Sequence, residues 1–427
     1  MGLRVETTFG RAMASWPDPR AARRLRDSVS EAFHVDKEKV KCVAAPYRVC
    51  PVGAHVDHQG GLVSGFAIDQ GVLLAFFPSK EVNLISNNFQ GAVWFSVDKI
   101  PNARESEEEA CWGDYARGAA LALQKAGYPL KRGITGMIEG PANMHGCGVS
   151  SSAALGCALL LAFEEANNIK VSPTQNVKLD GYIENNYLGL KNGIMDPSIV
   201  LMAKKGHLVL VDCEKESFEL IPRPNSMVPP PFRVLLVFSG ISAALTGTDF
   251  NNRVDECHQA ARKLLEARGD NASVDARLCA LDASVFQLFQ CRLSVVEQKR
   301  AMHFFTECAR VRSAAEHWCI GDWESLGKVM YESCESSIHN YECGIEPLTE
   351  LISMLKSYES VIGARFSGAG FRGCCVALVG SASANDVAAD VLRRYRERYP
   401  EYKDAAFALV ADEADGARVV ELCDRYK

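Results

Sequence analysis

The amino-acid sequence predicts a two-domain α+β protein, on three observations. The chain has 427 residues, more than the roughly 300 at which a single hydrophobic core usually stops growing. A segment at 222–231 holds five of the chain's 17 prolines and lies between two strand-like runs, at 208–213 and 233–240. The half that follows this segment is the more helical. Because a stiff, proline-rich run is typical of a connector, we place residues 1–221 in one domain and 222–427 in the other.

The expected elements follow from periodicity and from the residues that punctuate it. Residues 62–78 are rich in branched and aromatic side chains, and Gly65 and Gly71 indicate a strand, a turn and a second strand. The charged segment 101–110 is predicted to be a loop. Further strands are expected near 40–46 and 134–138, helices over 112–126, 252–267, 297–317 and 345–357, and a strand-turn-strand unit over 361–379.

The composition excludes several classes of function. Hydrophobic residues make up 48% and charged residues 23%, an ordinary globular balance. The net charge of -6 and the lack of a Lys/Arg block argue against a nucleic-acid partner. The 16 cysteines form no C-x-x-C pair, so free thiols are expected rather than a zinc site. The longest apolar run, 153–163, is too short to span a membrane, and no signal segment opens the chain, so we expect a cytoplasmic protein.

A glycine-rich loop precedes an apolar helix in the segment 145–163, HGCGVSSSAALGCALLLAF. Glycines let a backbone approach a phosphate, and the first turn of a helix directs N–H groups and the positive end of its dipole at the anion. The segment therefore predicts a phosphate site, in which Ser151 or Ser152 could also place a hydroxyl on Mg²⁺. It lacks the lysine of the common P-loop. A plain serine N-cap with close-packed glycines is the alternative.

A cluster of polar side chains lies in the loop 45–61, APYRVCPVGAHVDHQGG. Arg48, His55, Asp57 and His58 fall within eleven positions, among glycine, proline and apolar residues. A single polar residue there would indicate a solvated surface turn. Four from one short connection indicate a site that hydrogen-bonds the several hydroxyls of a sugar.

The apolar segment 192–202, NGIMDPSIVLM, contains a single acidic residue. Asp196 has apolar neighbours, so its carboxylate must be paired or must titrate, and either condition suits a general base. The alternative is an N-cap for a helix that starts at Pro197. The two roles are compatible, so the alternative does not remove the catalytic one.

A third glycine-rich segment spans 365–379, RFSGAGFRGCCVALV. Gly368, Gly370 and Gly373 indicate a tight turn close to a ligand or to another backbone. Their spacing matches G-x-G-x-x-G, but the sequence continues as a strand instead of opening a helix. This continuation argues against a dinucleotide-binding fold.

These segments, in this order, resemble the three signature motifs of the GHMP kinases (galactokinase, homoserine, mevalonate and phosphomevalonate kinases). Similarity to the galactokinase branch continues through the stretches 192–196, 204–213, 252–257 and 340–351, and it covers roughly residues 42 to 380. The resemblance implies a ribosomal-protein-S5-domain-2-like N-terminal half and a ferredoxin-like C-terminal half. The active site is then expected between the two halves.

The resemblance also implies roles for individual residues. Asp196 would take the proton of the sugar O1 hydroxyl. Arg48 would orient Asp196 and neutralise charge on the transferred phosphoryl group. Gly193 and Gly370 would contact the sugar. The family precedent is a monomer that binds ATP, Mg²⁺ and a small-molecule sugar. The residues implied to hold the ATP phosphates and Mg²⁺ are Gly146, Cys147, Gly148, Val149, Ser150, Ser151 and Ser152.

The sugar loop departs from the galactokinase pattern in a way that favours an acidic sugar. Galactokinases usually read G-E-H-T-D here, and the glutamate accepts hydrogen bonds from hydroxyls that include the one on C6, whereas this chain has Ala54. If C6 is a carboxylate, the loss of the glutamate removes a repulsion of about 4 kcal/mol at about 4 Å. His58 and Phe250 replace tyrosines, and Arg372 adds positive charge. His58 is a candidate cation or donor for the carboxylate.

The substitutions predict galacturonic acid as the substrate, and the chain most resembles the galacturonic-acid-specific members of the galactokinase branch. Galactokinase activity is the near alternative, and Ala54 is the feature against it, because it removes a hydrogen-bond acceptor without replacing it. Glucuronokinase activity is a further alternative, because glucuronate differs from galacturonate only at C4 and no residue reads the orientation of that hydroxyl. A non-catalytic sugar sensor is the alternative from another class. It is disfavoured because Arg48, Asp196 and the SSSAA loop are all present.

Overall fold

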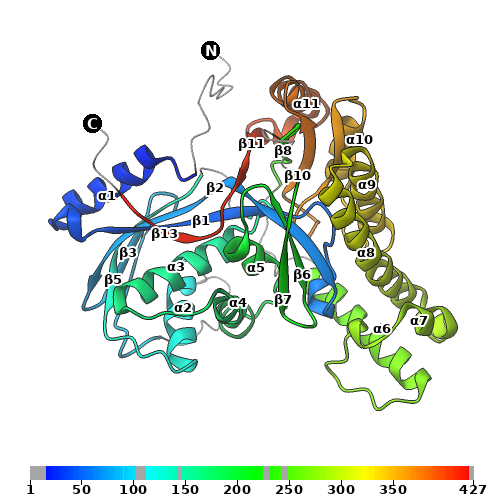
Figure 1. Cartoon of the computed structure of the whole chain (residues 1–427), viewed down its shortest axis with the longest axis horizontal. Coiled ribbons are helices and arrows are strands. Elements are labelled where there is room, and N and C mark those ends of the chain that lie inside the picture. Colours follow the sequence, from blue (N-terminus) through cyan, green and yellow to red (C-terminus); the bar gives the residue numbers. More distant parts are fainter. Residues whose placement is uncertain are drawn as a thin grey trace.

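The computed structural model describes residues 16–89, 91–101, 112–141, 144, 146–224, 230–241 and 249–422. The predicted loop 101–110 therefore lies almost entirely outside the described residues. Two β-sheets with helices packed around them make up the described chain (Figure 1). The mixed fold confirms the predicted α+β class.

The larger sheet has nine strands within the described residues, in the order β13-β1-β2-β5-β3-β4, with the hairpin β6–β7 joined to β2. Its strands are antiparallel except for β3 and β5, which run parallel. The strands from the first half are β1 (Lys41–Val49), β2 (Leu62–Ser79), β3 (Val82–Ser86), β4 (Ala92–Phe95), β5 (Gly133–Glu139), β6 (His207–Asp212) and β7 (Ser217–Pro222).

Five helices accompany this sheet: α1 (Pro19–Phe33), α2 (Gly113–Lys125), α3 (Ser151–Asn167), α4 (Pro173–Gly181) and α5 (Met195–Met202). A π-helical segment, Tyr182–Tyr187, continues α4. Helix α3 packs against β1 and β2, and 12 of its 17 residues are buried. It carries little polar surface because it is enclosed on all sides.

The smaller sheet has the order β11-β8-β10-β9 and is antiparallel throughout. Its strands are β8 (Phe232–Phe238), β9 (Val361–Phe366), β10 (Cys374–Gly380) and β11 (Phe407–Ala411). The helices of this half are α6 (Phe250–Arg268), α7 (Ala283–Phe289), α8 (Val295–Ile320), α9 (Trp323–His339), α10 (Glu346–Lys356) and α11 (Ala384–Arg398). Along the chain, β8 is followed by α6 to α10, then by β9 and β10, and then by α11 and β11. This order is the β-α-β-β-α-β pattern of the predicted ferredoxin-like half.

The end of the chain returns to the first sheet. Strand β12 (Glu413–Ala414) pairs with β2, and β13 (Arg418–Val420) pairs with β1 at Cys42 to Ala44. The larger sheet therefore includes two short strands from the segment that the sequence assigned to the second domain, and the division into 1–221 and 222–427 stays a prediction. Sequence reasoning missed the return because short edge strands carry no pattern that identifies their partner.

Residues 62–79 form one long strand, β2, so the prediction of a turn within this segment is wrong. The two glycines serve close approach instead. A Cβ on Gly71 would lie 2.2 Å from the Ala45 carbonyl oxygen, and one on Gly65 would lie 2.3 Å from Ile199. The pairing register of β1 with β2 shifts between Pro46 and Tyr47, so Pro46 lies at a bulge inside β1 and does not end it.

Helix α8 joins the two halves through one buried indole. Trp318 packs on Phe66 of β2 with ring centroids 5.6 Å apart and on Phe232 of β8 at 6.0 Å. Figure 1 shows α8 and α9 side by side, next to the smaller sheet. None of the helices in the described ranges is both long and apolar enough to cross a membrane.

Candidate active site

A pocket opens where loops from both halves meet. The β1–β2 connection, the start of α3, the start of α5, the start of α6 and the β9–β10 loop all contribute to its wall. The lining residues are Arg48, Ala54, His55, Asp57, Gly146, Gly148, Ser150, Ser151, Ser152, Asn192, Gly193, Met195, Asp196, Phe250, Gly368, Ala369 and Arg372. The pocket thus brings together most of the residues predicted from the three motifs.

Helix α3 begins at this pocket, and Ser150 occupies its N-cap position. Ser150 has a left-handed backbone (φ 60°, ψ 43°), and its side chain does not cap the helix. Its hydroxyl instead donates to Asp196 Oδ2 at 2.5 Å. The plain N-cap interpretation of this serine is therefore wrong, and the start of a long helix faces the pocket as an anion site requires.

Asp196 lies in the first turn of α5, where Arg48 of β1 holds its other oxygen. Helix α5 begins at Met195, so Asp196 is not the predicted N-cap. Arg48 Nε donates to Asp196 Oδ1 at 2.8 Å, and Arg48 Nη1 donates to the Gly148 carbonyl at 3.0 Å. Burial alone would lower the pKa of Arg48, but the charge of Asp196 and the hydrogen bond to it, with smaller contributions from nearby thiols, together outweigh burial and the pKa is raised. The pair is therefore ionic.

The third glycine-rich segment, 365–379, packs directly against the phosphate loop. A Cβ on Gly148 would lie 2.4 Å from the Ser367 carbonyl oxygen, and one on Gly368 would lie 2.6 Å from Gly148 Cα. Ser367 Oγ also donates to the Gly148 carbonyl at 2.7 Å. Only glycine permits this contact, so these two glycines bind one half of the molecule to the other at the pocket.

On the opposite wall, the sugar loop presents Ala54, His55 and Asp57. The His55 ring stacks on Tyr341 with centroids 4.3 Å apart, and burial, with His303 nearby, lowers its pKa well below the ordinary value. His55 is therefore neutral. Burial raises the pKa of Asp57 to about 6, and the charge of Asp196 adds to the shift. The Met195 N–H donates to Asp57 at 3.3 Å.

Gly193 and Phe250 complete that wall. Gly193 lies so close to Asp57 that a Cβ would be 2.4 Å from the Asp57 Cγ. Phe250, the first residue of α6, makes an edge-to-face contact with the His58 ring at 6.3 Å. Both residues thus lie beside the sugar loop, and their contact with the sugar stays a prediction.

Four predicted residues do not line the pocket. His58 lies behind the wall, where Tyr341 and Gln59 engage its two ring nitrogens at 3.1 Å each. Burial lowers the pKa of His58 to about 3, so the prediction that it is a cation for a sugar carboxylate is not supported. Gly370 packs instead on the Cys343 carbonyl. Cys147 and Val149 turn their side chains into the core.

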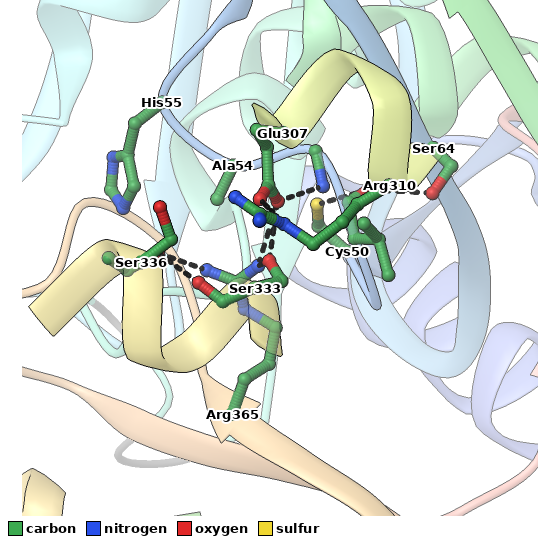
Figure 2. Close-up of polar contacts among 12 residues, drawn as sticks. Cys50, Ala54, His55, Ser64, Glu307, Arg310, Ser333, Ser336 and Arg365 are labelled. Atoms are coloured by element: carbon green, nitrogen blue, oxygen red, sulfur yellow. Dashed lines mark hydrogen bonds and ion pairs between the residues drawn. The ribbon is translucent and has the colours of Figure 1, made fainter. Parts of the chain in front are cut away.

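A buried ionic cluster on α8 fixes the sugar loop from behind (Figure 2). Glu307 is fully buried and accepts from the Gly53 N–H at 2.7 Å and from Arg310 Nε at 2.7 Å, and Arg365 Nη1 lies 3.6 Å away. One turn earlier, His303 Nε2 donates to the Ala54 carbonyl at 3.0 Å. Two residues of one helix face therefore hold backbone groups of two consecutive loop residues, Gly53 and Ala54.

Removing the Glu307 carboxylate should destabilise the protein strongly. In Glu307→Ala the buried Arg365 loses its counter-ion and the Gly53 N–H loses its acceptor, and breaking a buried pair in this way costs about 3–5 kcal/mol. Urea unfolding measures the loss. The matched control is Glu335→Ala, because Glu335 is exposed on α9 and pairs only with exposed His339; its expected cost is below about 1 kcal/mol. Equal losses in both variants would contradict the assigned role of the cluster.

Two buried carboxylates behind the phosphate loop escaped sequence reasoning. Glu184 lies in the π-helical segment, and its Oε2 accepts from Asn192 at 2.9 Å. Its Oε1 and both carboxylate oxygens of Asp180 are buried without a hydrogen-bond partner in the described chain. Burial raises the pKa of Glu184 to about 7, and Ser152 is a hydrogen-bonding neighbour. The signal for Glu184 in the sequence is a single acid between apolar and aromatic residues in the segment YIENNY.

The pocket between the two halves combines a carboxylate that is held by an arginine with a glycine-rich loop at the start of a helix. This arrangement is the one expected of a small-molecule phosphotransferase. Residues 114–204 match the family model described as GHMP kinases N terminal domain, and residues 311–397 match GHMP kinases C terminal. The chain belongs to the GHMP kinase family.

Similar proteins place the chain among the sugar kinases of this family. The chain is 43% identical over 425 residues to a galacturonokinase of Arabidopsis thaliana, an alignment that covers 95% of this chain and 100% of that protein. A galactokinase of Roseiflexus is 30% identical over 87% of this chain and 91% of its own length. The structure of Lactococcus lactis galactokinase complexed with galactose superimposes with a TM-score of 0.83 at 26% identity, covering 94% of this chain and 100% of that one.

Proposed function

We propose that this protein transfers the γ-phosphoryl group of ATP to the anomeric hydroxyl of D-galacturonic acid, giving galacturonic acid 1-phosphate and ADP. The observation that carries the kinase chemistry is the position of Asp196, held by Arg48 and Ser150 at the mouth of the anion loop. The substrate assignment is supported by Ala54 in the pocket wall and by the name of the Arabidopsis relative.

In this mechanism Asp196 accepts the O1 proton as the bond from O1 to the γ-phosphorus forms and the bond from that phosphorus to the β–γ bridging oxygen breaks. Phosphoryl transfer depends mainly on positioning and on charge stabilisation. Arg48 holds Asp196 in place and contributes positive charge beside the transferred group. The first turn of α3 directs N–H groups at the nucleotide phosphates.

The site also fits Mg²⁺. The buried Glu184 Oε1 without a hydrogen-bond partner and the neighbouring Ser152 hydroxyl are hard oxygen ligands beside the phosphate loop, and Ser151 also lines the pocket. No group of three or more His, Cys, Asp or Glu within the described residues could hold a metal by itself. Mg²⁺ is commonly bound by one or two carboxylates together with substrate phosphates, where it neutralises their charge. We therefore expect Ser152 and Glu184, with Ser151 as the second candidate serine, to hold it.

The wall at Ala54 suits an acidic sugar. Ala54 presents only a methyl group, and its carbonyl is already engaged by His303. Asp57, the remaining acid of this wall, has a pKa of about 6, so close to neutral pH part of the population is protonated and can donate to a substrate carboxylate. Charge repulsion with a uronic acid is thereby reduced without the cation that His58 was expected to supply.

The arginine of the pair gives a separate test. Arg48→Ala should lower kcat about 10- to 150-fold, the equivalent of one hydrogen bond to a charged group, and should change ATP affinity less. Arg48→Lys is the control, because it keeps the charge but not the two-pronged contact with Asp196 and Gly148. Steady-state kinetics distinguish the roles. An effect confined to the sugar KM would reassign Arg48 to substrate binding.

The proposed reaction is tested by following ADP release from Mg-ATP with galacturonate, glucuronate, galactose or no sugar. A preference for galacturonate is expected. A preference for galactose would keep the kinase chemistry and refute the interpretation of Ala54. No turnover with any sugar would favour the non-catalytic sensor.

We further propose that the chain acts as a monomer in the cytosol. Fourteen cysteines within the described residues are free thiols, and most are buried, which suits a reducing compartment. Analytical ultracentrifugation at micromolar concentration tests the monomer, and a fluorescent fusion tests the location.

A further inference from the structure

The pocket contains a second arginine that the proposed mechanism does not use. Arg372 lies in the β9–β10 loop, directly after Phe371, whose left-handed backbone (φ 61°) turns the chain. Arg372 Nη1 donates to the Gly146 carbonyl at 2.5 Å, whereas its Nε is buried without a hydrogen-bond partner. Arg372 also lines the pocket, so its guanidinium is within reach of a ligand bound there.

Arg372 faces the phosphate loop and not the sugar wall. Its hydrogen bond is to Gly146, the first glycine of that loop, and its titratable neighbours, Cys147 and Tyr115, are neutral because burial raises the pKa of both. The next residue, Gly373, packs on the Cys147 carbonyl, where a Cβ would lie 2.7 Å from the oxygen. The backbone of the third motif thus fixes Arg372 against the start of the anion site.

The two pocket arginines have different electrostatic situations. Arg48 is neutralised by Asp196 at 2.8 Å, whereas no carboxylate in the described part of the chain pairs with Arg372. Burial lowers the pKa of Arg372. A partly buried guanidinium without a counter-ion gains more from a bound anion than an arginine that is already paired.

We propose that Arg372 binds the β- and γ-phosphate oxygens of the nucleotide, providing the positive charge that the phosphate loop lacks in the absence of a P-loop lysine. The planar guanidinium can bind two phosphate oxygens at once while Nη1 stays on Gly146. The proposal rests on ATP being the phosphoryl donor, but it does not depend on which sugar accepts the phosphoryl group. Arg372, which the sequence assigned to the sugar, is thereby assigned to the nucleotide.

The test is a series of calorimetric titrations without sugar, with the non-hydrolysable ATP analogue AMP-PNP, ADP and AMP, each with Mg²⁺. Arg372→Gln should weaken binding of AMP-PNP and ADP by about tenfold or more and that of AMP by less than about twofold. Arg372→Lys, which keeps the charge, should lie between Arg372→Gln and the parent. Arg393→Gln removes an exposed arginine on α11 and controls for net charge; its affinities should match those of the parent.

Several outcomes would overturn the proposal. Equal weakening of AMP and AMP-PNP would show that the substitution disturbs the whole nucleotide site, and unchanged affinities would show no contact. A rise confined to the galacturonate KM would assign Arg372 to the sugar carboxylate. A parent protein that binds AMP-PNP but phosphorylates no uronic acid would refute the proposed substrate alone, because these titrations contain no sugar.

Discussion

Replacing Asp196 by alanine is expected to lower kcat at least about a hundredfold while ATP affinity stays nearly unchanged. The carboxylate is the group in the pocket that Arg48 and Ser150 hold by both of its oxygens, and it lies in the first turn of α5. Without it O1 would have to lose its proton to water. The phosphate contacts expected on α3 are independent of that carboxylate, so nucleotide binding should persist.

Single-turnover kinetics and AMP-PNP titration measure the two effects separately. Asp390→Ala is the matched control, since Asp390 is an exposed carboxylate on α11 paired with Arg393. Asp196→Asn tests the same step with less change of shape, because the amide keeps hydrogen bonds but cannot take the proton. Near-parental turnover in both Asp196 variants would exclude this residue as the base.

The parts of the site that sequence alone predicted are those encoded locally. The glycine-serine loop with its helix, and Asp196 before a proline, each carry their chemistry within about ten residues, and the structure places them on one pocket. The α+β class was predictable for the same reason, since α6 and α10 each show their own helical periodicity.

The parts that sequence missed depend on residues far apart in the chain. Gly53 meets Glu307 across 254 positions, and His58 meets Tyr341 across 283. A histidine in a polar loop is expected to be exposed, and only the packing of α6 and Tyr341 over it shows that it is buried and neutral. Likewise, nothing within 413–420 indicates that β12 and β13 pair with β2 and β1.

The other large effect is expected from a single charge placed at position 54. Ala54→Glu should lower kcat/KM for galacturonate by up to nearly three orders of magnitude, because two carboxylates about 4 Å apart repel by about 4 kcal/mol at an effective dielectric of 20. Galactose carries no such charge, so its kcat/KM should fall much less. The measurement is kcat/KM for both sugars with each variant.

Ala54 is buried, at 4% exposure, so a longer side chain has a steric cost of its own. Ala54→Gln carries the same cost without the charge, and the ratio between the two variants therefore isolates the electrostatic effect. Both variants keep Asp57, so its titration, with a pKa of about 6, affects them alike and the ratio reports the charge at position 54. If the two variants discriminate between galacturonate and galactose equally, repulsion at this wall does not select the substrate, and shape alone must do so.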